Sequence, residues 1–208
     1  MIFSDREDAA RRLAEALAQY RGQNPLVLAI PRGAVTMAKI IADELGGEVD
    51  VVLVRKLRAP GNPEFAIGSV DESGWTYLGD YAEQGGGSPQ YIEAEKEVQL
   101  KVMRERRASY TPIRPPHDPA GRIVIVVDDG LATGSTMIAA LHALRAKSPK
   151  KLICAVPVAP PDTLEKVKPY ADEVVCLSAP EMFYAVGQFY QSFPQVSDGE
   201  VIALLTAV

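Results

Sequence analysis

The chain has 208 residues, of which 47% are hydrophobic and 24% are charged, a composition that suits one globular domain with a buried core. Its 22 basic and 27 acidic residues give a net charge of −5, which argues against a general nucleic-acid-binding protein. No apolar run approaches the roughly 18 residues that span a bilayer, and the N-terminus lacks a signal-peptide layout. We therefore expect a cytoplasmic protein with no nucleic-acid or membrane partner. Cys154 and Cys176 lie in apolar runs and are expected to be reduced thiols.

Hydrophobic patterning divides much of the chain into alternating helices and buried strands. The strands are continuous apolar runs, which is typical of a parallel sheet covered by helices on both faces. A capping-box pattern at Ser4 and Glu7 marks the first helix, and Gly46 stops the second. The predicted elements are a helix from Ser4 to Gly22, strand 26–30, helix 34–45, strand 49–54, strand 123–127, helix 135–146, strand 152–158, helix 161–170 and strand 173–177. The predicted fold class is α/β, with a Rossmann-like parallel sheet.

Residues 58–119 interrupt this alternation. They show no strong buried strand, and they contain Gly85–Gly87, a charged helical stretch over 90–110 and a proline cluster that ends at Pro119. About sixty residues are too many for a plain connection between core strands. We therefore expect one domain over residues 1–208 with an inserted lid or flap at about 58–119, mobile around residues 80–90 without ligand. Residues 180–208 carry an aromatic patch and a capped helix, and they are expected to form a C-terminal hood.

The run from Ile123 to Thr136 carries the strongest chemical signal. A buried strand ends in Asp128 and Asp129, at the carboxyl edge of the sheet where α/β proteins bind ligands. A turn of small residues, 132–136, then opens a helix, and its N–H groups and hydroxyls can cradle an anion. An acidic turn followed by ordinary helix capping is the simpler alternative, but it does not explain two carboxylates beside a separate anion cradle. The pattern favours a sugar phosphate ligand.

The same run resembles the signature of type I phosphoribosyltransferases that binds 5-phosphoribosyl 1-pyrophosphate (PRPP), in the version closest to adenine phosphoribosyltransferases. The resemblance implies that Asp128 and Asp129 hold the ribose hydroxyls and, through PRPP and water, the environment of a Mg²⁺ cofactor. It also implies that the turn binds the 5-phosphate, and that a Cβ at Gly134 would intrude on this anion site. The implied PRPP-binding residues are Arg32, Gly33, Ala34, Arg55, Lys56, Asp128, Asp129, Gly130, Leu131, Ala132, Thr133, Gly134, Ser135 and Thr136.

Two shorter matches extend the resemblance. Residues 30–34 look like the family's pyrophosphate loop, in which Gly33 admits an anion and Arg32 supplies a bidentate donor. Members often hold a non-proline cis peptide there, which aligns with the Pro31–Arg32 bond. Arg55 and Lys56, taken as the end of the second core strand, resemble a basic pair that meets pyrophosphate; a solvated strand end is the alternative.

The aromatic segment 183–190 resembles the tail of hypoxanthine-type enzymes, in which an aromatic ring stacks on the base. Its spacing departs from that pattern by about one residue, and the Asp-Tyr pair that follows the glycine there is missing. Phe183 and Tyr184 are therefore the candidate base-binding residues, and an aromatic cluster that belongs to the core is the alternative.

The resemblance implies transfer of the 5-phosphoribosyl group of PRPP to a nitrogenous base with release of pyrophosphate. Asp128, Asp129 and Lys56 are the candidate catalytic residues: the acids favour positive charge on the ribose, and Lys56, with Arg32 and Mg²⁺, neutralises the leaving group. Arg104, Arg106 and Arg107 end the charged helix, where their charges suit the helix dipole; as an alternative to this structural role, a lid helix could bring one of them to pyrophosphate. A PRPP-binding regulator without catalysis and a hydrolase acting on the sugar pyrophosphate are the rival functions, and a homodimer is a further expectation.

Overall fold

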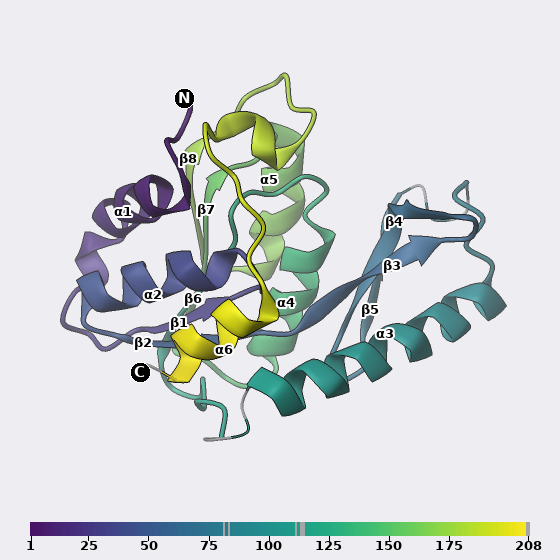
Figure 1. Ribbon diagram of the computed structural model, residues 1–208, viewed down its shortest axis with the longest axis horizontal. Coiled ribbons are helices and arrows are strands. Elements are labelled where there is room, and N and C mark those ends of the chain that lie inside the picture. Colours follow the sequence, from purple (N-terminus) through teal and green to yellow (C-terminus); the bar gives the residue numbers. More distant parts are fainter. Residues whose placement is uncertain (81, 83, 111, 113–114, 207–208) are drawn as a thin grey trace.

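The computed structural model describes residues 1–80, 82, 84–110, 112 and 115–206. Five parallel strands form the central sheet, in the order β2-β1-β6-β7-β8 (Figure 1). Their bounds are Leu26–Ala29 for β1, Glu48–Val51 for β2, Ile123–Val127 for β6, Lys151–Val158 for β7 and Glu173–Ser178 for β8. This architecture confirms the α/β class and the helix-covered parallel sheet predicted from the apolar runs.

Helices cover both faces of the sheet, so β1, β6 and β7 bury side chains on both faces, whereas β8 at the edge is only partly buried. Alternate residues such as Val27, Ile125 and Ile153 pack on the side of α1 (Arg6–Ala16) and α2 (Ala34–Leu45). Their neighbours, such as Val124 and Cys154, pack on the side of α4 (Ser135–Arg145) and α5 (Pro161–Val167). Because successive side chains of a strand point to opposite faces and both faces are covered, most strand positions are apolar; Asp50 of β2 is a buried exception.

The order of the strands reverses between β1 and β6. From β1 the chain crosses to β2 on one side, and from β6 it crosses to β7 and β8 on the other. The two strands pair in parallel with Ala29 opposite Val127, so the loops that follow them leave the sheet side by side. Open α/β sheets bind ligands at such a reversal, outside the carboxyl ends of the strands.

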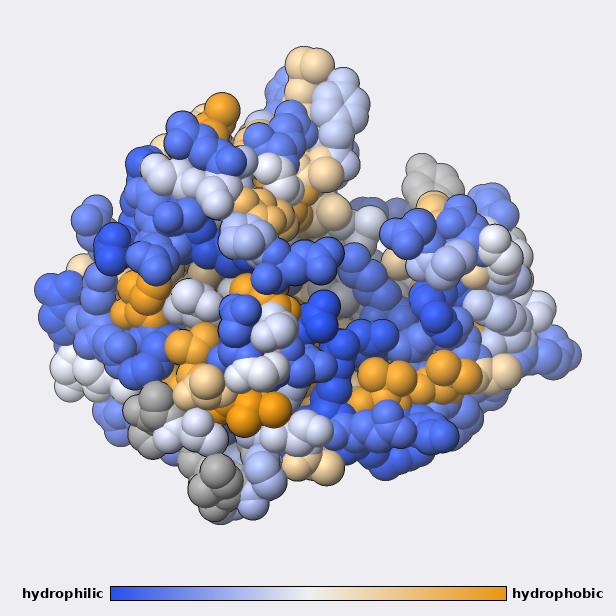
Figure 2. Space-filling view, in the orientation of Figure 1, coloured by the Kyte–Doolittle hydropathy of each residue, from blue (hydrophilic) through white to orange (hydrophobic). Residues whose placement is uncertain are grey.

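A second sheet projects from this core. It is antiparallel, in the order β3-β4-β5, with β3 at Val54–Ala59, β4 at Asn62–Asp71 and β5 at Thr76–Leu78, and it lies against the long helix α3 (Pro89–Tyr110). We call β3, β4, β5 and α3 the lobe; it extends to the right in Figure 1, and Figure 2 shows the hollow between the upper part of the core and the lobe. The His142 ring of α4 stacks on Trp75 of the lobe with 3.7 Å between ring centroids, which joins the two parts.

The insertion and the strand before it differ from their predictions in two ways. The apolar run 49–54 is not one strand: β2 ends at Val51, and Val54 already belongs to β3 of the second sheet. The second half of β4 is a buried strand where none was predicted, since Gly68, Ser69 and Asp71 hide its apolar pattern. The mobility expected around residues 80–90 concerns a stretch that includes Tyr81 and Glu83, which lie outside the described residues.

Helix boundaries follow the predictions with local shifts. Asp5, not Ser4, caps α1 by accepting a hydrogen bond from the Asp8 amide, and the helix gives way to a 3₁₀ turn (Ala18–Tyr20) before Gly22. A second 3₁₀ turn (Lys168–Tyr170) ends the stretch predicted as helix 161–170. The tail forms a third 3₁₀ turn (Val186–Phe189) and then α6 (Asp198–Thr206). Among the described residues, no helix is both long and apolar enough to cross a membrane. Cys154 and Cys176 are free thiols.

Substitution of Gly68 tests the close contact between β4 and β5 of the lobe. A Cβ on Gly68 would lie 2.1 Å from the Tyr77 carbonyl oxygen on β5, whereas a Cβ on Gly79 would meet its nearest neighbour at 3.6 Å. We expect Gly68→Ala to separate β4 from β5 and lower the free energy of unfolding by about 1–3 kcal/mol, and Gly79→Ala to change it by about 0.5 kcal/mol or less. Urea titration followed by the fluorescence of Trp75, the single tryptophan, measures both. Equal stability of the two variants would contradict the close β4–β5 contact.

Candidate functional site

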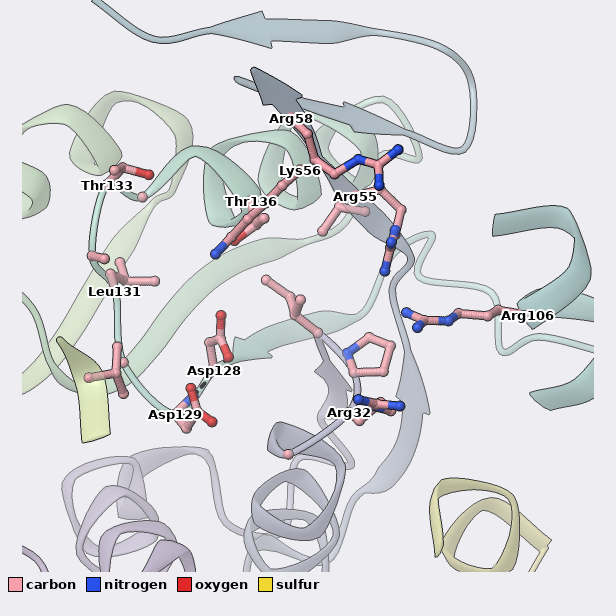
Figure 3. A pocket seen from close by; sticks show the side chains of 18 of the residues that line it. Arg32, Arg55, Lys56, Arg58, Arg106, Asp128, Asp129, Leu131, Thr133 and Thr136 are labelled. Atoms are coloured by element: carbon pink, nitrogen blue, oxygen red, sulfur yellow. Dashed lines mark hydrogen bonds between the residues drawn. The ribbon is translucent and has the colours of Figure 1, made fainter. Parts of the chain in front are cut away.

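A cavity of about 450 Å³ opens where the strand order reverses. The loop after β1 and the turn after β6 form one wall, and β3 and α3 of the lobe supply the opposite wall (Figure 3). The sequence places residues far apart in the chain into this one space, because parallel pairing aligns the ends of β1 and β6.

The two strand-end acids stand at the floor of the cavity. Asp128 accepts a hydrogen bond at Oδ1 from the Asp129 amide at 2.9 Å. Burial and the negative charge of Asp129 raise the pKa of Asp128 well above its ordinary value of 3.8, while the ammonium of Lys56 acts in the opposite direction. Arg6 forms an ion pair with Asp129 at 3.1 Å, so the two acids face different electrostatic surroundings.

The turn after the acids forms the next part of the wall. The cavity is lined by Gly130, Leu131, Ala132, Thr133, Gly134 and Thr136. The hydroxyls of Thr133 and Ser135 lie 3.2 Å apart, and the helix α4 begins at Ser135. A helix N-terminus preceded by a turn of small residues presents backbone N–H groups to an anion. Ser135 itself is buried and does not line this cavity, unlike the other predicted residues of the turn.

Gly134 is constrained by its backbone conformation and by its contacts with α5. It adopts a left-handed conformation with φ +81°, and a Cβ there would lie 2.8 Å from Thr163 Cγ2 and 3.3 Å from Val167, both on α5. A side chain there would therefore press on α5, and its effect on the anion site stays a prediction. The glycine is required by the backbone and by packing, so a substitution would affect stability as well as binding.

The loop after β1 brings the second expected anion-binding segment to the cavity. The Pro31–Arg32 peptide is cis, in agreement with the expectation from the resemblance. Arg32 and Gly33 line the cavity, and Arg32 lies 3.9 Å from Asp198 of α6. Ala34, also a predicted binding residue, is the first residue of α2 and is buried below the loop.

The lobe contributes the remaining positive charge. Arg55 and Lys56 lie on β3 of the lobe and not at the end of the second core strand, which corrects their predicted position. Figure 3 shows the Lys56 ammonium directed toward the space between Thr136 and Asp128. Burial and the nearby charges of Arg106, Arg58 and Arg32 lower the pKa of Arg55. Five cations, Arg32, Arg55, Lys56, Arg58 and Arg106, therefore line the cavity with two acids, which suits a polyanionic ligand.

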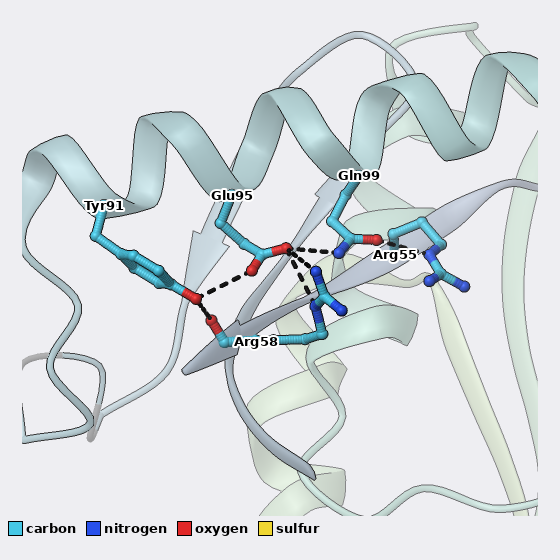
Figure 4. A network of polar contacts seen from close by, with 5 residues as sticks. All are labelled: Arg55, Arg58, Tyr91, Glu95 and Gln99. Atoms are coloured by element: carbon cyan, nitrogen blue, oxygen red, sulfur yellow. Dashed lines mark hydrogen bonds and ion pairs between the residues drawn. The ribbon is translucent and has the colours of Figure 1, made fainter. Parts of the chain in front are cut away.

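A polar network on α3 binds two of these cations, Arg55 and Arg58 (Figure 4). Glu95, 6% exposed, accepts hydrogen bonds at Oε1 from Arg58 Nε at 3.3 Å and Nη2 at 3.2 Å. Gln99, 1% exposed, accepts from Arg55 Nε at 2.9 Å and donates to Glu95 at 2.6 Å. Sequence reasoning missed Arg58, Glu95 and Gln99. The four-residue spacing of Glu95 and Gln99 places them on one face of a helix, but only the antiparallel lobe brings β3 beneath that face.

The tail residues proposed to bind a base lie apart from the cavity. Phe183 packs against the core and against Phe189, with 5.1 Å between ring centroids. Tyr184 is 81% exposed. Val186, which follows them, does line the cavity and packs against Gly130. The base-binding role of Phe183 and Tyr184 stays a prediction.

Asp128 and Asp129 are the residues of this cavity that could bind a Mg²⁺ ion. No cluster of three or more His, Cys, Asp or Glu residues suited to a metal ion exists within the described part of the chain. Mg²⁺ commonly uses one or two carboxylates together with substrate phosphates and water. Asp128 and Asp129 are oxygen donors at the floor of a cavity suited to a polyanion, so the residues present fit a Mg²⁺ ion that arrives with a phosphorylated ligand.

Comparison with known proteins agrees with this geometry. The family model of the phosphoribosyl transferase domain matches residues 3–193. The chain belongs to the phosphoribosyltransferases of type I, as the motif after β6 indicated.

Three relatives extend the comparison. A crystal structure of the protein TT1426 from Thermus thermophilus superposes with a TM-score of 0.82 at 47% identity, covering 100% of this chain and 99% of that one. A Mycobacterium tuberculosis H37Rv protein, provisionally named a phosphoribosyl transferase, is 42% identical over 205 residues. The match covers 98% of this chain, which spans 46% of the length of that relative. A uracil phosphoribosyltransferase of Acinetobacter baylyi is 39% identical over 75 residues, 36% of this chain and 35% of the relative.

The two acids should respond oppositely to amide substitution. Because the folded state raises the pKa of Asp128, its carboxyl retains a proton that the unfolded chain releases. The contribution of this one group to the free energy of unfolding therefore falls as the pH rises from about 4 toward the raised pKa. Asp128→Asn should therefore raise the melting temperature, more at pH 8 than at pH 5. Asp129→Asn loses the ion pair with Arg6 and should lower it. Calorimetric melting at both pH values tests this, and a lower melting temperature of Asp128→Asn at pH 8 would contradict it.

Glu95 should matter for ligand affinity. Glu95→Gln removes the charge that holds Arg58, so we expect pyrophosphate binding to weaken by about three- to tenfold. Glu93→Gln is the matched control, because Glu93 lies on the same helix, is exposed and pairs with Lys96 at 3.7 Å. Isothermal calorimetry with pyrophosphate measures both variants. Equal affinities would mean that the network does not position Arg58.

Proposed function

We propose that the protein transfers the 5-phosphoribosyl group of PRPP to a nitrogenous base and releases pyrophosphate. One observation carries the proposal: paired strand-end acids and an anion-binding turn face a wall of cations across a single cavity at the point where the sheet reverses. The acids suit a polyol, the turn suits a terminal phosphate, and the cations suit a second, larger anion. PRPP combines these three groups in one molecule.

Different residues of the cavity bind different parts of PRPP. The turn 130–136 binds the 5-phosphate, and Asp128 and Asp129 accept hydrogen bonds from the ribose hydroxyls. Arg32, Arg55 and Lys56 bind the pyrophosphate, and Arg58 and Arg106 line the same cavity and add positive charge. When bound with PRPP, Mg²⁺ supplies further charge neutralisation for the phosphates. The acid pair also favours the positive charge that develops on the ribose carbon as its bond to pyrophosphate lengthens.

Closure of the lobe would protect the reaction from water. Hydrolysis of PRPP competes with transfer, so a site that excludes water favours the base. The lobe supplies one wall, and an ion pair at 2.7 Å between Asp80, which follows β5, and Lys166 of α5 links it to the core. These contacts support a lid role for the insertion, and Val186 and Pro63 give the cavity an apolar border for a base.

The acceptor can be identified by release of pyrophosphate. The full chain is incubated with PRPP and Mg²⁺, alone and with adenine, hypoxanthine, guanine, uracil or orotate; the partial likeness to a uracil enzyme supports including uracil. Release that depends on one base is the expected result. Release without any base would replace the proposal with a hydrolase, and tight PRPP binding without release would replace it with a regulator.

Lys56 provides the corresponding test of mechanism. Lys56→Met removes a charge that would neutralise the leaving group, so the rate of pyrophosphate release should fall by about a hundredfold. Lys39→Met is the control, because Lys39 lies on α2 and pairs with Asp43 away from the cavity. Steady-state kinetics with the base identified above compare the two. A rate for Lys56→Met within twofold of the wild type would exclude this role of the ammonium.

A further inference from the structure

The first turn of α1 reaches the candidate site through Arg6. Its guanidinium donates to Asp129 Oδ2 from Nε at 3.2 Å and from Nη2 at 3.1 Å. The side chains of Arg6 and Asp129 are only 11% and 18% exposed, so water screens the contact weakly. Charged hydrogen bonds in such a setting hold a carboxylate in a defined orientation.

Arg6 is itself fixed by contacts between the two ends of the chain, which we call the terminal clasp: residues 3–4 paired with residues 189–192. The Phe3 amide donates to Phe189 O at 2.8 Å, the Gln191 amide to Phe3 O at 2.8 Å and the Ser192 amide to Ser4 O at 2.9 Å. Beyond the clasp, Arg6 donates to the Pro194 carbonyl and lies 4.0 Å from the centre of the Phe193 ring. The guanidinium therefore has little freedom to turn away from Asp129.

The clasp also holds the backbone of the same acid. The Tyr190 hydroxyl donates to the Asp129 carbonyl oxygen at 2.6 Å. Burial and the charge of Asp129 raise the pKa of Tyr190, so the hydroxyl remains a donor at neutral pH. Both the side chain and the carbonyl of Asp129 are thus held by segments from opposite ends of the sequence.

Arg6 further contacts the loop after β1. A Cβ on Gly33 would lie 2.6 Å from Arg6 Nη2 and 2.7 Å from Arg6 Cζ and Nε. The guanidinium therefore lies directly against Gly33 and bridges the two loops that leave the reversal point of the sheet. Gly33 admits this side chain because it has none of its own.

In each of the two acids, Asp128 and Asp129, these contacts engage one carboxylate oxygen. Arg6 engages Asp129 at Oδ2, and the Asp129 amide engages Asp128 at Oδ1. The second oxygen of each carboxylate takes no part in these two contacts. We propose that Arg6 is a positioning residue, which turns Asp129 so that Oδ1 meets a hydroxyl of the ribose. This inference rests on the proposed function, and it gives α1 and the clasp a role in the site.

Two simple ligands separate positioning from general damage. D-ribose 5-phosphate carries both the diol and the phosphate, whereas inorganic phosphate lacks the diol and reports only on anion binding by the turn after β6 and the cations. Arg6→Leu should weaken binding of ribose 5-phosphate by about tenfold, the range expected for loss of a charged hydrogen bond, and leave phosphate binding unchanged. Arg6→Lys keeps the charge without the fork and should fall between the wild type and Arg6→Leu.

Arg12→Leu is the matched control. Arg12 lies on α1, pairs with Asp8 at 3.0 Å and lies over the Phe3 ring at 5.5 Å, so it touches the clasp but not Asp129. It should bind both ligands as the wild type does. In the Asp129→Asn background, Arg6→Leu should cause no further loss for ribose 5-phosphate, since the residue acts through that carboxylate.

The outcomes are distinct. Isothermal calorimetry with each ligand, together with melting temperatures, is run on the full chain. Equal binding of ribose 5-phosphate by Arg6→Leu and wild type overturns the inference alone, as does equal weakening for both ligands. Absence of ribose 5-phosphate and PRPP binding in the wild type overturns the proposed function, and the inference with it.

Discussion

The parallel pairing of β1 with β6 is the constraint on which the site depends. Ala29 lies opposite Val127, so residues 31–33 and 128–130 leave the sheet as neighbours although about a hundred residues separate them. Pairing of two buried, apolar strands needs no polar side chain and leaves the strand ends free for chemistry. The lobe, the tail and the N-terminal helix all contribute to the site by packing around this one junction.

Positive charge is concentrated at this junction, and neighbouring acids reduce the electrostatic repulsion that results. Five cations line one cavity, and their mutual repulsion is moderated by acids placed behind or beside them. Glu95 neutralises Arg58 from α3, and Asp198 approaches Arg32 from α6. A preorganised set of charges loses little energy when a polyanion binds, because the protein need not rearrange to face it. Negative charge in the cavity is also unfavourable: burial beside Asp129 disfavours the charged form of Asp128 and raises its pKa.

The lobe shows why sequence patterns misread some segments. In the run 49–54, every residue except Asp50 is apolar, and nothing in it marks the point where the chain leaves one sheet for another. In β4, Gly68 permits the close approach of β5, and Asp71 accepts hydrogen bonds from Ser73 and Trp75, so the buried half of the strand lacks an apolar signature. Both errors arise because burial there depends on contacts between segments and not on local periodicity.

The sequence by itself determined the elements of the core, the acid pair and turn after β6, and the loop after β1. These features are local: continuous apolar runs, capping residues and a turn of small residues act within a few positions of one another. Only the tertiary structure placed Arg58, Arg106, Glu95 and Gln99 around the cavity, turned the Cβ direction of Gly134 toward α5, and brought Arg6 to Asp129. The reason is physical: a hydrogen bond between residues 6 and 129 leaves no periodic trace, because it depends on how helices and strands pack rather than on how each one forms.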